Sequence, residues 1–366
     1  MPAGLYVHIP FCKKRCLYCD FFSTTLLNKR EEYIQALLKE INQRKDEASE
    51  PIRTIYIGGG TPSTLDAEDI QSILDTIGAN DAEEITMELN PGDASLQYMQ
   101  AIRKAGINRL SIGIQSFQDS LLTCIGRRHN AHQAIEAVQW AQQAGFNNIS
   151  IDLMYALPTQ TMTQWKEDIE TALSLNIQHL SSYGLMYEPG TVLTQQRDDN
   201  QLTPIDEETE IAMYDYLDKR LQEAGFVHYE VSNFALPGRE AKHNSSYWNH
   251  IPYVGVGAGA HSFIRNVRSW NPDDLNAYIQ GINSGNLVRE CETLSDRDLY
   301  NERIMLGLRT NRGIEDPTKS RDDADLKQKI LDNTRDNMLT FTGDGRLVAT
   351  QKGWHILNRI IEQLMI

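Results

Sequence analysis

The sequence has little positive charge, and it has no long apolar run. Among 366 residues, 35 are lysine or arginine and 50 are aspartate or glutamate, which gives a formal net charge of -15 at pH 7. An acidic chain is not expected to bind nucleic acid, because phosphate contacts need a basic surface. A local basic pocket at residues 127–129 remains compatible with this balance. No apolar run approaches the roughly 20 residues that cross a bilayer.

Cysteine is also scarce, and its odd number disfavours a disulfide framework, more strongly than a zinc site. There are five cysteines, an odd number, and Cys124 and Cys291 stand alone in the sequence. The N-terminal stretch has no basic segment followed by an apolar run, so we expect no secretory signal and a reducing cytoplasmic location. A zinc site stays open as the less favoured alternative, because neither a second cysteine pair nor an H-x3–5-H pair is present.

The other three cysteines lie within eight residues of one another near the start of the chain. Cys12, Cys16 and Cys19 form a C-x3-C-x2-C pattern, with Tyr18 directly before the last cysteine. Three thiolates suit three corners of a four-iron cluster. The fourth iron would keep an open position, which the amino and carboxylate groups of S-adenosylmethionine could chelate. Such a cofactor supplies radical chemistry.

Short apolar runs alternate with helical patterns over residues 1–205, the first predicted domain. We expect strands at 5–9, 54–57, 84–89, 109–114, 148–153 and 179–183, and helices at 31–43, 67–77, 96–105, 132–144 and 162–175. This alternation predicts an α/β fold with parallel strands. Six units are too few for a closed eight-fold barrel, so a partial (β/α)6 barrel is expected, with its ligand at the C-terminal strand ends.

Residues from 206 onward do not continue the strand–helix alternation. A long helix is expected at 207–224, and an aromatic and glycine-rich stretch follows within a second unit, 206–290. Helices at 296–308 and 325–337, a hairpin at 342–345 and a final helix at 353–365 predict a small α+β, winged-helix-like domain at 291–366. Because the chain is acidic, packing or capping is favoured over DNA binding for this domain.

Polar residues recur where the predicted strands end. A Gly58-Gly59-Gly60-Thr61 turn follows the second strand, and glycine there would let the backbone approach a ligand. Glu88, Gln115 and Asp152 end or follow the next three strands, and Arg127 lies beyond the fourth. One such residue is usually a helix cap. Several in one layer of a barrel favour a binding site.

A second group of polar and aromatic residues lies at 243–262. His243 opens the segment H-N-S-S-Y-W, and His261 follows in G-V-G-A-G-A-H-S. Histidine can ligate haem iron, and aromatic rings could pack on a flat macrocycle. From the residues alone, a hydrogen-bonded structural histidine is the favoured interpretation of His243.

Taken together, these motifs resemble the radical S-adenosylmethionine (SAM) superfamily, and within it the branch related to oxygen-independent coproporphyrinogen III oxidase. The resemblance covers nearly the whole chain and rests on LYVHIPFC, GGGTPS, ELNPG, RLSIGIQSF, GRRHN, DLMYALP, YEVSNFA, GVGAGAHS and ERIMLGLRTNRGI. It implies a [4Fe-4S] cluster on Cys12, Cys16 and Cys19. It also implies S-adenosylmethionine contacts from Tyr6, Gly58, Gly59, Thr61, Glu88, Gln115, Arg127 and Asp152, with Tyr18 beside the cluster.

Two departures separate the chain from the oxidases of this branch. Phe21 stands where the oxidases have a further cysteine, and only eleven residues precede Cys12, where the oxidases have a long arm. Both departures, and the H-N-x-x-Y-W match at His243, resemble the HemW family of haem chaperones. The resemblance implies haem binding and delivery to haem-dependent proteins such as respiratory enzymes. A membrane-associated acceptor and a homodimer stay open.

An enzymatic function is the alternative hypothesis. The intact cluster and cofactor motifs would also suit a radical enzyme that acts on a porphyrinogen, or a radical methyltransferase of the same branch. Phe21, the short N-terminal segment and the match at His243 favour the chaperone.

Overall fold

The first half of the chain alternates strands and helices, as the sequence predicts. The computed structural model describes residues 3–47, 50–319, 321 and 323–366. The strands are β1 (Ala3–Ile9), β2 (Ile52–Gly59), β3 (Glu84–Leu89), β4 (Arg109–Gln115), β5 (Ile149–Tyr155) and β6 (His179–Gly184). The helices between them are α1 (Arg30–Arg44), α2 (Ala67–Ile77), α3 (Leu96–Ala105), α4 (Asp119–Cys124), α5 (Ala131–Gln143) and α6 (Met162–Ser174). The sequence predicts all of them except the short α4.

Local hydrogen bonds fix where these helices begin. The side chains of Asp66, Ser95, Asn130 and Thr161 stand at the N-caps of α2, α3, α5 and α6, and each accepts a hydrogen bond from the third following backbone N–H. Such a cap contributes about 1 kcal/mol. Helices α2, α3 and α6 follow the C-terminal ends of β2, β3 and β5, so their caps also fix loops in which a ligand site is expected, whereas α5 follows α4.

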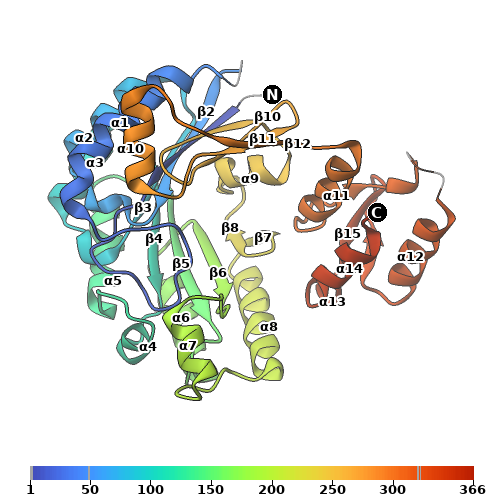
Figure 1. The fold of residues 1–366 in the computed structure, drawn as a ribbon. Coiled ribbons are helices and arrows are strands. Elements are labelled where there is room, and N and C mark those ends of the chain that lie inside the picture. Colours follow the sequence, from blue (N-terminus) through green and yellow to red (C-terminus); the bar gives the residue numbers. More distant parts are fainter. Residues whose placement is uncertain (1–2, 48–49, 320, 322) are drawn as a thin grey trace.

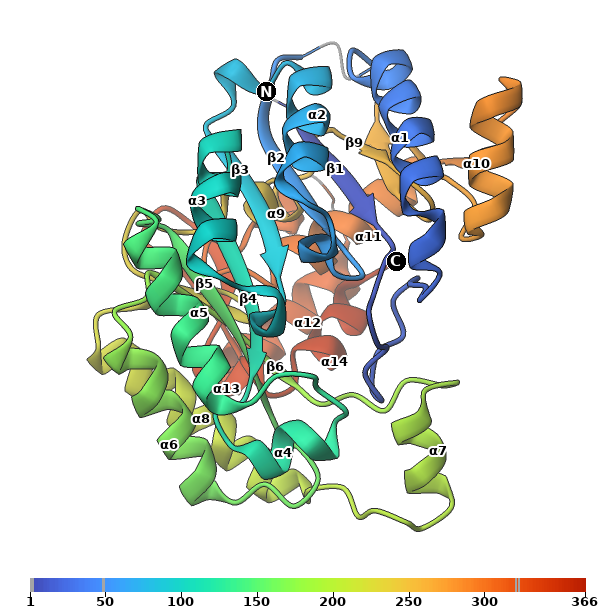
Figure 2. The ribbon, with the colours of Figure 1, turned by 90° about the vertical axis from the view of Figure 1, so that its left-hand side faces the viewer.

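The parallel strands form an open, partial barrel. β1 to β6 pair in chain order, and the helices between them pack on one face of the sheet (Figures 1 and 2). The barrel does not close, because the other neighbour of β1 is β9 and the other neighbour of β6 is β8. The predicted α/β fold with a partial (β/α)6 barrel is therefore confirmed.

Short strands extend the sheet on both sides. They are β7 (Val227–Glu230), β8 (Asn233–Ala235), β9 (Tyr253–Val256), β10 (His261–Ile264), β11 (Val267–Trp270) and β12 (Glu290–Thr293). The whole sheet has twelve strands in the order β12-β11-β10-β9-β1-β2-β3-β4-β5-β6-β8-β7. The sequence does not predict this extension, since strands of three or four residues are too short to show a periodic pattern.

Four more helices belong to this part of the chain. They are α7 (Val192–Asp198), α8 (Glu207–Glu223), α9 (Lys242–Trp248) and α10 (Leu275–Ser284). Helix α8 lies where the sequence predicts a long helix. Helix α10 packs on α1, whereas α9, which carries the H-N-x-x-Y-W segment, packs against β2 (Figure 1). No helix among the described residues is long and apolar enough to cross a membrane.

The C-terminal part of the chain forms a second, smaller unit. It contains α11 (Asp296–Gly307), β13 (Ile314–Glu315), α12 (Ala324–Arg335), β14 (Leu339–Phe341), β15 (Arg346–Ala349), α13 (Gln351–Trp354) and α14 (Leu357–Leu364). Its sheet, β13-β15-β14, is separate from the large one (Figure 1). Residues from Ile304 to Leu364 form its own apolar core. The predicted small α+β domain is present, and the predicted domain boundaries stay predictions.

Candidate functional site

A cavity of about 380 Å³, here called the first cavity, lies at the C-terminal ends of the parallel strands. The structure brings ten of the predicted site residues to its wall. They are Cys12, Cys16, Tyr18, Cys19, Gly59, Thr61, Glu88, Gln115, Arg127 and Asp152. Loops gather at this end of a parallel barrel, which is why ligands bind there.

The three cysteines of the motif reach the first cavity from one loop. Cys12 is buried and its Sγ lies 3.4 Å from Oγ1 of Thr61, while Arg127 Nη1 donates a hydrogen bond to Cys16 Sγ at 3.4 Å. Burial raises the pKa of the Cys12 and Cys19 thiols, and negative charge on Cys16 raises each pKa further. The three thiols therefore lie within electrostatic reach of one another, and none is in a disulfide.

One buried carboxylate fixes the rim of the first cavity. Asp93 accepts hydrogen bonds from Lys13 Nζ at 2.7 Å, from Arg128 Nη2 at 2.8 Å and from Ser63 Oγ at 3.1 Å. Its side chain is only 2% exposed. These partners come from the cysteine loop, the segment after α4 and the turn after β2. Asp93 thus holds three sequence motifs in one arrangement, and sequence reasoning did not single it out.

Glu88 at the end of β3 is linked to the glycine turn after β2. Its Oε1 accepts a hydrogen bond from Tyr56 at 2.8 Å, and its Oε2 accepts one from the Gly59 N–H at 3.1 Å. An added Cβ at Gly58 would lie 2.7 Å from the Tyr56 ring and 3.0 Å from Glu88, so only glycine allows this packing. Burial raises the pKa of Glu88 to about 7.

Strand β4 lines the first cavity with alternate residues. Arg109, Ser111, Gly113 and Gln115 all face it, as every second residue of a strand should. Ser111 Oγ donates to Asp152 Oδ1 at 3.1 Å, which orients that carboxylate. Gln115 has a φ of 73°, an unusual value for a residue other than glycine, at the point where β4 and β5 change register. Such conformations concentrate at functional sites.

Two buried guanidinium groups in the first cavity have unused donors. Arg109 is 1% exposed. Neither its Nε nor the Nε of Arg127 has a hydrogen-bond partner among the described residues. A buried donor without a partner costs about 1–3 kcal/mol. Both arginines line the first cavity, so an anionic ligand there would satisfy them.

Sequence reasoning also missed several polar residues of the first cavity. They are Tyr56, Arg109, Ser111, Ser181 and Asn244. Strand β4 did carry a signal, because its polar and small residues alternate strictly with apolar ones. Asn244 belongs to the H-N-x-x-Y-W segment, from which only His243 was taken as a site residue, whereas Tyr56 and Ser181 lie on strands whose local sequence looks ordinary.

The structure places His243 outside the wall of the first cavity. Its side chain is buried, with Nδ1 2.9 Å from Thr54 Oγ1 and Nε2 2.8 Å from the Tyr247 hydroxyl. Its backbone N–H donates to Glu84, the first residue of β3, at 2.9 Å. Helix α9 therefore caps the N-terminal ends of the strands. The imidazole has no free nitrogen in this structure, which agrees with the structural interpretation.

A second cavity of about 580 Å³ lies beside the first, between the cysteine loop and the sheet extension. Tyr6, predicted to contact S-adenosylmethionine, lines this cavity. Asp20 and Phe21 line both cavities and form a shared wall. The Phe21 side chain, at the position of the oxidases' extra cysteine, is 69% exposed.

The residues of the first cavity fit both a cluster and S-adenosylmethionine. Three free thiols suit three irons of a [4Fe-4S] cluster. Within the described residues, no three His, Cys, Asp or Glu side chains converge as they would around one metal ion. The Arg127 guanidinium, whose Nε has no partner among the described residues, suits a carboxylate, and the Glu88 and Asp152 carboxylates suit an ammonium group or ribose hydroxyls.

Comparisons with known proteins agree with the motifs. Residues 6–172 match the Radical SAM superfamily. The chain is 36% identical to heme chaperone HemW of Lactococcus lactis, over 100% of this chain and 98% of that protein. It is 35% identical to heme chaperone HemW of Bacillus subtilis, over 94% of this chain and 97% of the other.

A vertebrate protein and a solved structure are also similar. Radical S-adenosyl methionine domain-containing protein 1, mitochondrial, of Danio rerio is 34% identical over 85% of this chain and 74% of its own length. Coproporphyrinogen III oxidase (HemN) from Escherichia coli superposes with a TM-score of 0.84, over 100% of this chain and 90% of that one. At 23% identity, this likeness shows the fold.

Proposed function

The chain belongs to the radical SAM superfamily and to its HemW family, and on this premise we propose that it is a haem chaperone. It binds a [4Fe-4S] cluster, S-adenosylmethionine and haem, and it passes haem to haem-dependent proteins. The observation that carries the proposal is the first cavity, where three free thiols meet buried carboxylates and guanidinium groups in a chain similar to HemW over its full length.

Cys12, Cys16 and Cys19 hold the cluster in this proposal. Arg127, which donates to Cys16 Sγ, stabilises negative charge on the sulfur. Asp93 keeps the cysteine loop in place through Lys13. The fourth iron is left without a protein ligand and is open to S-adenosylmethionine.

Residues at the strand ends bind and orient S-adenosylmethionine. Glu88 and the glycine turn accept its ammonium group, Asp152 accepts a ribose hydroxyl or the ammonium group, and Arg127 faces its carboxylate. When bound, the cluster and this cofactor supply one-electron chemistry at the sulfonium. The burial of these side chains excludes water and strengthens each charged contact.

Haem is the cargo of the proposed chaperone. The bacterial relatives are named heme chaperones, and we extend that role to this chain. The acceptors would be haem-requiring proteins such as respiratory enzymes. A membrane-associated acceptor, a homodimer and a cytoplasmic location stay predictions of the sequence.

The proposal is tested with anaerobically reconstituted protein. Ferric haem should bind with a defined spectrum, and added apo-acceptor should take that haem up faster from the protein than from free solution. If the reconstituted protein neither binds haem nor speeds its transfer, the chaperone function is wrong.

The intact first cavity favours one alternative function, that of a radical enzyme. It contains the thiols, carboxylates and guanidinium groups that a [4Fe-4S] cluster and S-adenosylmethionine would contact in a radical enzyme of the same branch. Incubation with coproporphyrinogen III, a reductant and S-adenosylmethionine separates the two. Sustained formation of protoporphyrinogen IX would replace the chaperone with an oxidase.

A further inference from the structure

The second cavity has walls suited to a flat and largely apolar ligand. Its volume of about 580 Å³ falls within the roughly 300–1,000 Å³ of small-molecule and cofactor sites. Apolar and aromatic side chains come to it from β1, the cysteine loop, α9 and the loop after it, the sheet extension and α11. They are Tyr6, Phe21, Phe22, Tyr247, Ile251, Tyr253, Phe263 and Leu306. Aromatic rings give such a ligand large faces against which it can stack.

Three histidines line this cavity, and their ring nitrogens are not equally free. His8 uses both, since Nδ1 lies 2.9 Å from the Tyr6 hydroxyl and Nε2 lies 3.1 Å from the Phe22 carbonyl. His250 Nε2 lies 2.9 Å from a carboxylate oxygen of Glu302. His261 is exposed, and among the described residues no hydrogen-bond partner is found for its ring. Among the three, His261 is therefore the histidine whose two ring nitrogens are both free to ligate.

The ring of His261 is held in place by stacking. His261 pairs with Trp270 across the β10–β11 hairpin, and the two rings stack with centroids 5.6 Å apart and planes at 18°. Partial burial, and then the charge of Arg268, lower the pKa of His261, so its imidazole is neutral near pH 7. Neutral imidazole is the form that binds iron.

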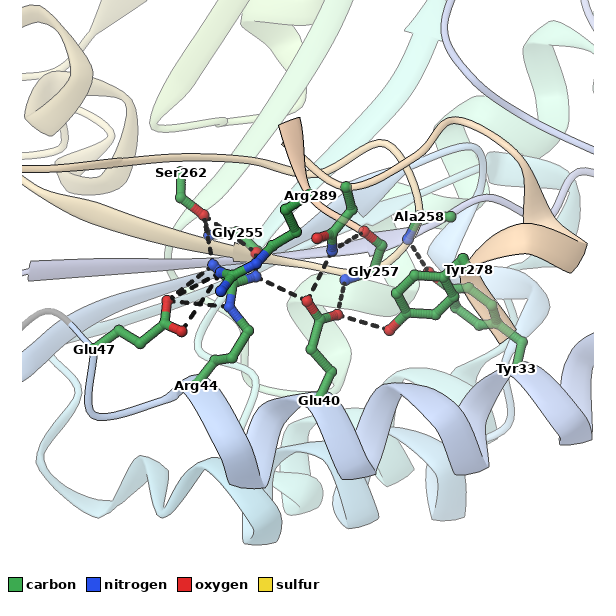
Figure 3. Close-up of polar contacts among 11 residues, drawn as sticks. Tyr33, Glu40, Arg44, Glu47, Gly255, Gly257, Ala258, Ser262, Tyr278 and Arg289 are labelled. Carbon is green, nitrogen blue, oxygen red and sulfur yellow. Dashed lines mark hydrogen bonds and ion pairs between the residues drawn. The ribbon is translucent and has the colours of Figure 1, made fainter. Parts of the chain in front are cut away.

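A buried ionic network fixes the strand that carries His261 (Figure 3). Glu40 and Arg44 of α1 form a 2.8 Å ion pair. Arg44 then donates to the Gly255 carbonyl at 2.7 Å and to Ser262 Oγ at 3.1 Å. Ser262 directly follows His261, so the network anchors β10, the strand that carries His261.

The packing around Gly255 adds a second restraint on His261. A Cβ at Gly255 would lie 2.0 Å from the His261 carbonyl oxygen, so β9 and β10 could not approach with a larger residue there. The glycines and His261 of the G-V-G-A-G-A-H-S segment thus belong to one arrangement, in which close backbone packing presents a free imidazole to the cavity.

The charged groups of the second cavity allow one arrangement of haem. They are Asp20, Arg268, Asp273 and Glu302. Three of the four are acidic, which disfavours buried propionates. Arg268 is already paired with Glu302 and Glu292. The propionates should therefore point to solvent past Arg268, and the apolar macrocycle should enter the cavity.

From these observations we propose that the second cavity binds haem, with His261 as an axial ligand of the iron and Phe21 against the macrocycle. The inference rests on the proposed haem chaperone function and names the site of its cargo. The cargo would lie directly across the Asp20–Phe21 wall from the cluster cysteines.

The experiment titrates reconstituted wild type, His261→Gly and His132→Ala with ferric haem. His132 is the matched control because it is a surface histidine of α5 that lines neither cavity. We expect His261→Gly to bind haem at least tenfold more weakly, about 1.4 kcal/mol, with a changed Soret band. Free imidazole should restore the wild-type Soret band in that variant. If His261 had only a structural role, added imidazole would not restore the band.

A second arm uses metal-free protoporphyrin IX, which cannot be ligated. Its affinity should be the same in wild type and His261→Gly but lower in Phe21→Ser. Unchanged haem affinity and spectrum in a folded His261→Gly variant would overturn the inference while the chaperone function stands. Failure of the wild type itself to bind haem would overturn both.

Discussion

The two cavities share a wall, yet the chain builds them in different ways. The first is lined by the C-terminal ends of long parallel strands and by loops that carry compact sequence motifs. The second is lined by β1, by the short strands beside it and by α9 and α11, with residues from Tyr6 to Leu306. The first is rich in buried charge and the second in aromatic rings. In the two proposals made above, the site for chemistry and the site for cargo are therefore different cavities of one fold.

The largest effect should come from the cysteine loop. We expect Cys16→Ala to lose its cluster completely under anaerobic reconstitution, while its affinity for ferric haem changes by less than roughly tenfold, about 1.4 kcal/mol. Iron and sulfide analysis and a haem titration measure the two properties. Cys124→Ala, which changes a cysteine outside both cavities, is the control. If Cys16→Ala loses haem binding together with its cluster, the two cavities do not bind their ligands separately.

The next effect concerns S-adenosylmethionine. Asp152→Asn keeps the shape of the side chain but removes the charge, so binding should weaken by about 1.5–3 kcal/mol, the value of a charged hydrogen bond. Calorimetry on cluster-loaded protein measures it, and Ser111→Ala should cost less because it removes only the neighbour that orients Asp152. Equal affinity in wild type and Asp152→Asn would place the cofactor elsewhere.

Two histidines should then separate stability from haem binding. His243→Ala removes a buried ring with two hydrogen bonds, so it should cost about 2–4 kcal/mol of unfolding free energy. His261→Gly changes an exposed residue and should cost less than about 1 kcal/mol. Chemical denaturation and haem titration of both variants check the contrast. A stable His243→Ala variant that cannot bind haem would reverse the two roles.

The smallest effect is a pH dependence confined to the first cavity. Burial raises the pKa of Glu88 from 4.5 to about 7, so its contribution to stability is present below pH 4.5 and is lost as pH rises through about 7. The melting temperature of the cofactor-free wild type should therefore fall, relative to that of Glu88→Gln, between pH 5 and pH 8. The affinity for S-adenosylmethionine should rise over the same interval, because its ammonium group pairs with ionised Glu88. If the melting temperatures of the wild type and Glu88→Gln change with pH in the same way, this prediction is wrong.

Sequence reasoning reached the first cavity because its signals are local. Caps such as Asp66 and Ser95 mark the helices, apolar runs mark the strands, and the parallel order then brings Glu88, Gln115 and Asp152 to one end of the barrel. No long-range contact had to be known in advance.

The second cavity could not be predicted in this way. Apart from β1, the strands that line it are four residues long, and its walls combine Tyr6 with Leu306, which lies 300 positions further along the chain. The sequence also could not decide the surroundings of His243, because a ligand and a buried hydrogen-bonded histidine have the same neighbours along the chain. The contacts with Thr54 and Tyr247 appear only in the folded structure.

The shared Asp20–Phe21 wall has a thermodynamic consequence. The loop that carries Cys19 and Phe21 adopts one conformation at a time, so whatever fills one cavity sets the boundary of the other. By linkage, if a bound cluster changes the affinity for haem by some factor, haem changes the affinity for the cluster by the same factor. Reciprocal coupling of this kind would make the affinity for the cluster depend on whether haem is bound. It would act through Asp20 and Phe21 and would need no hinge.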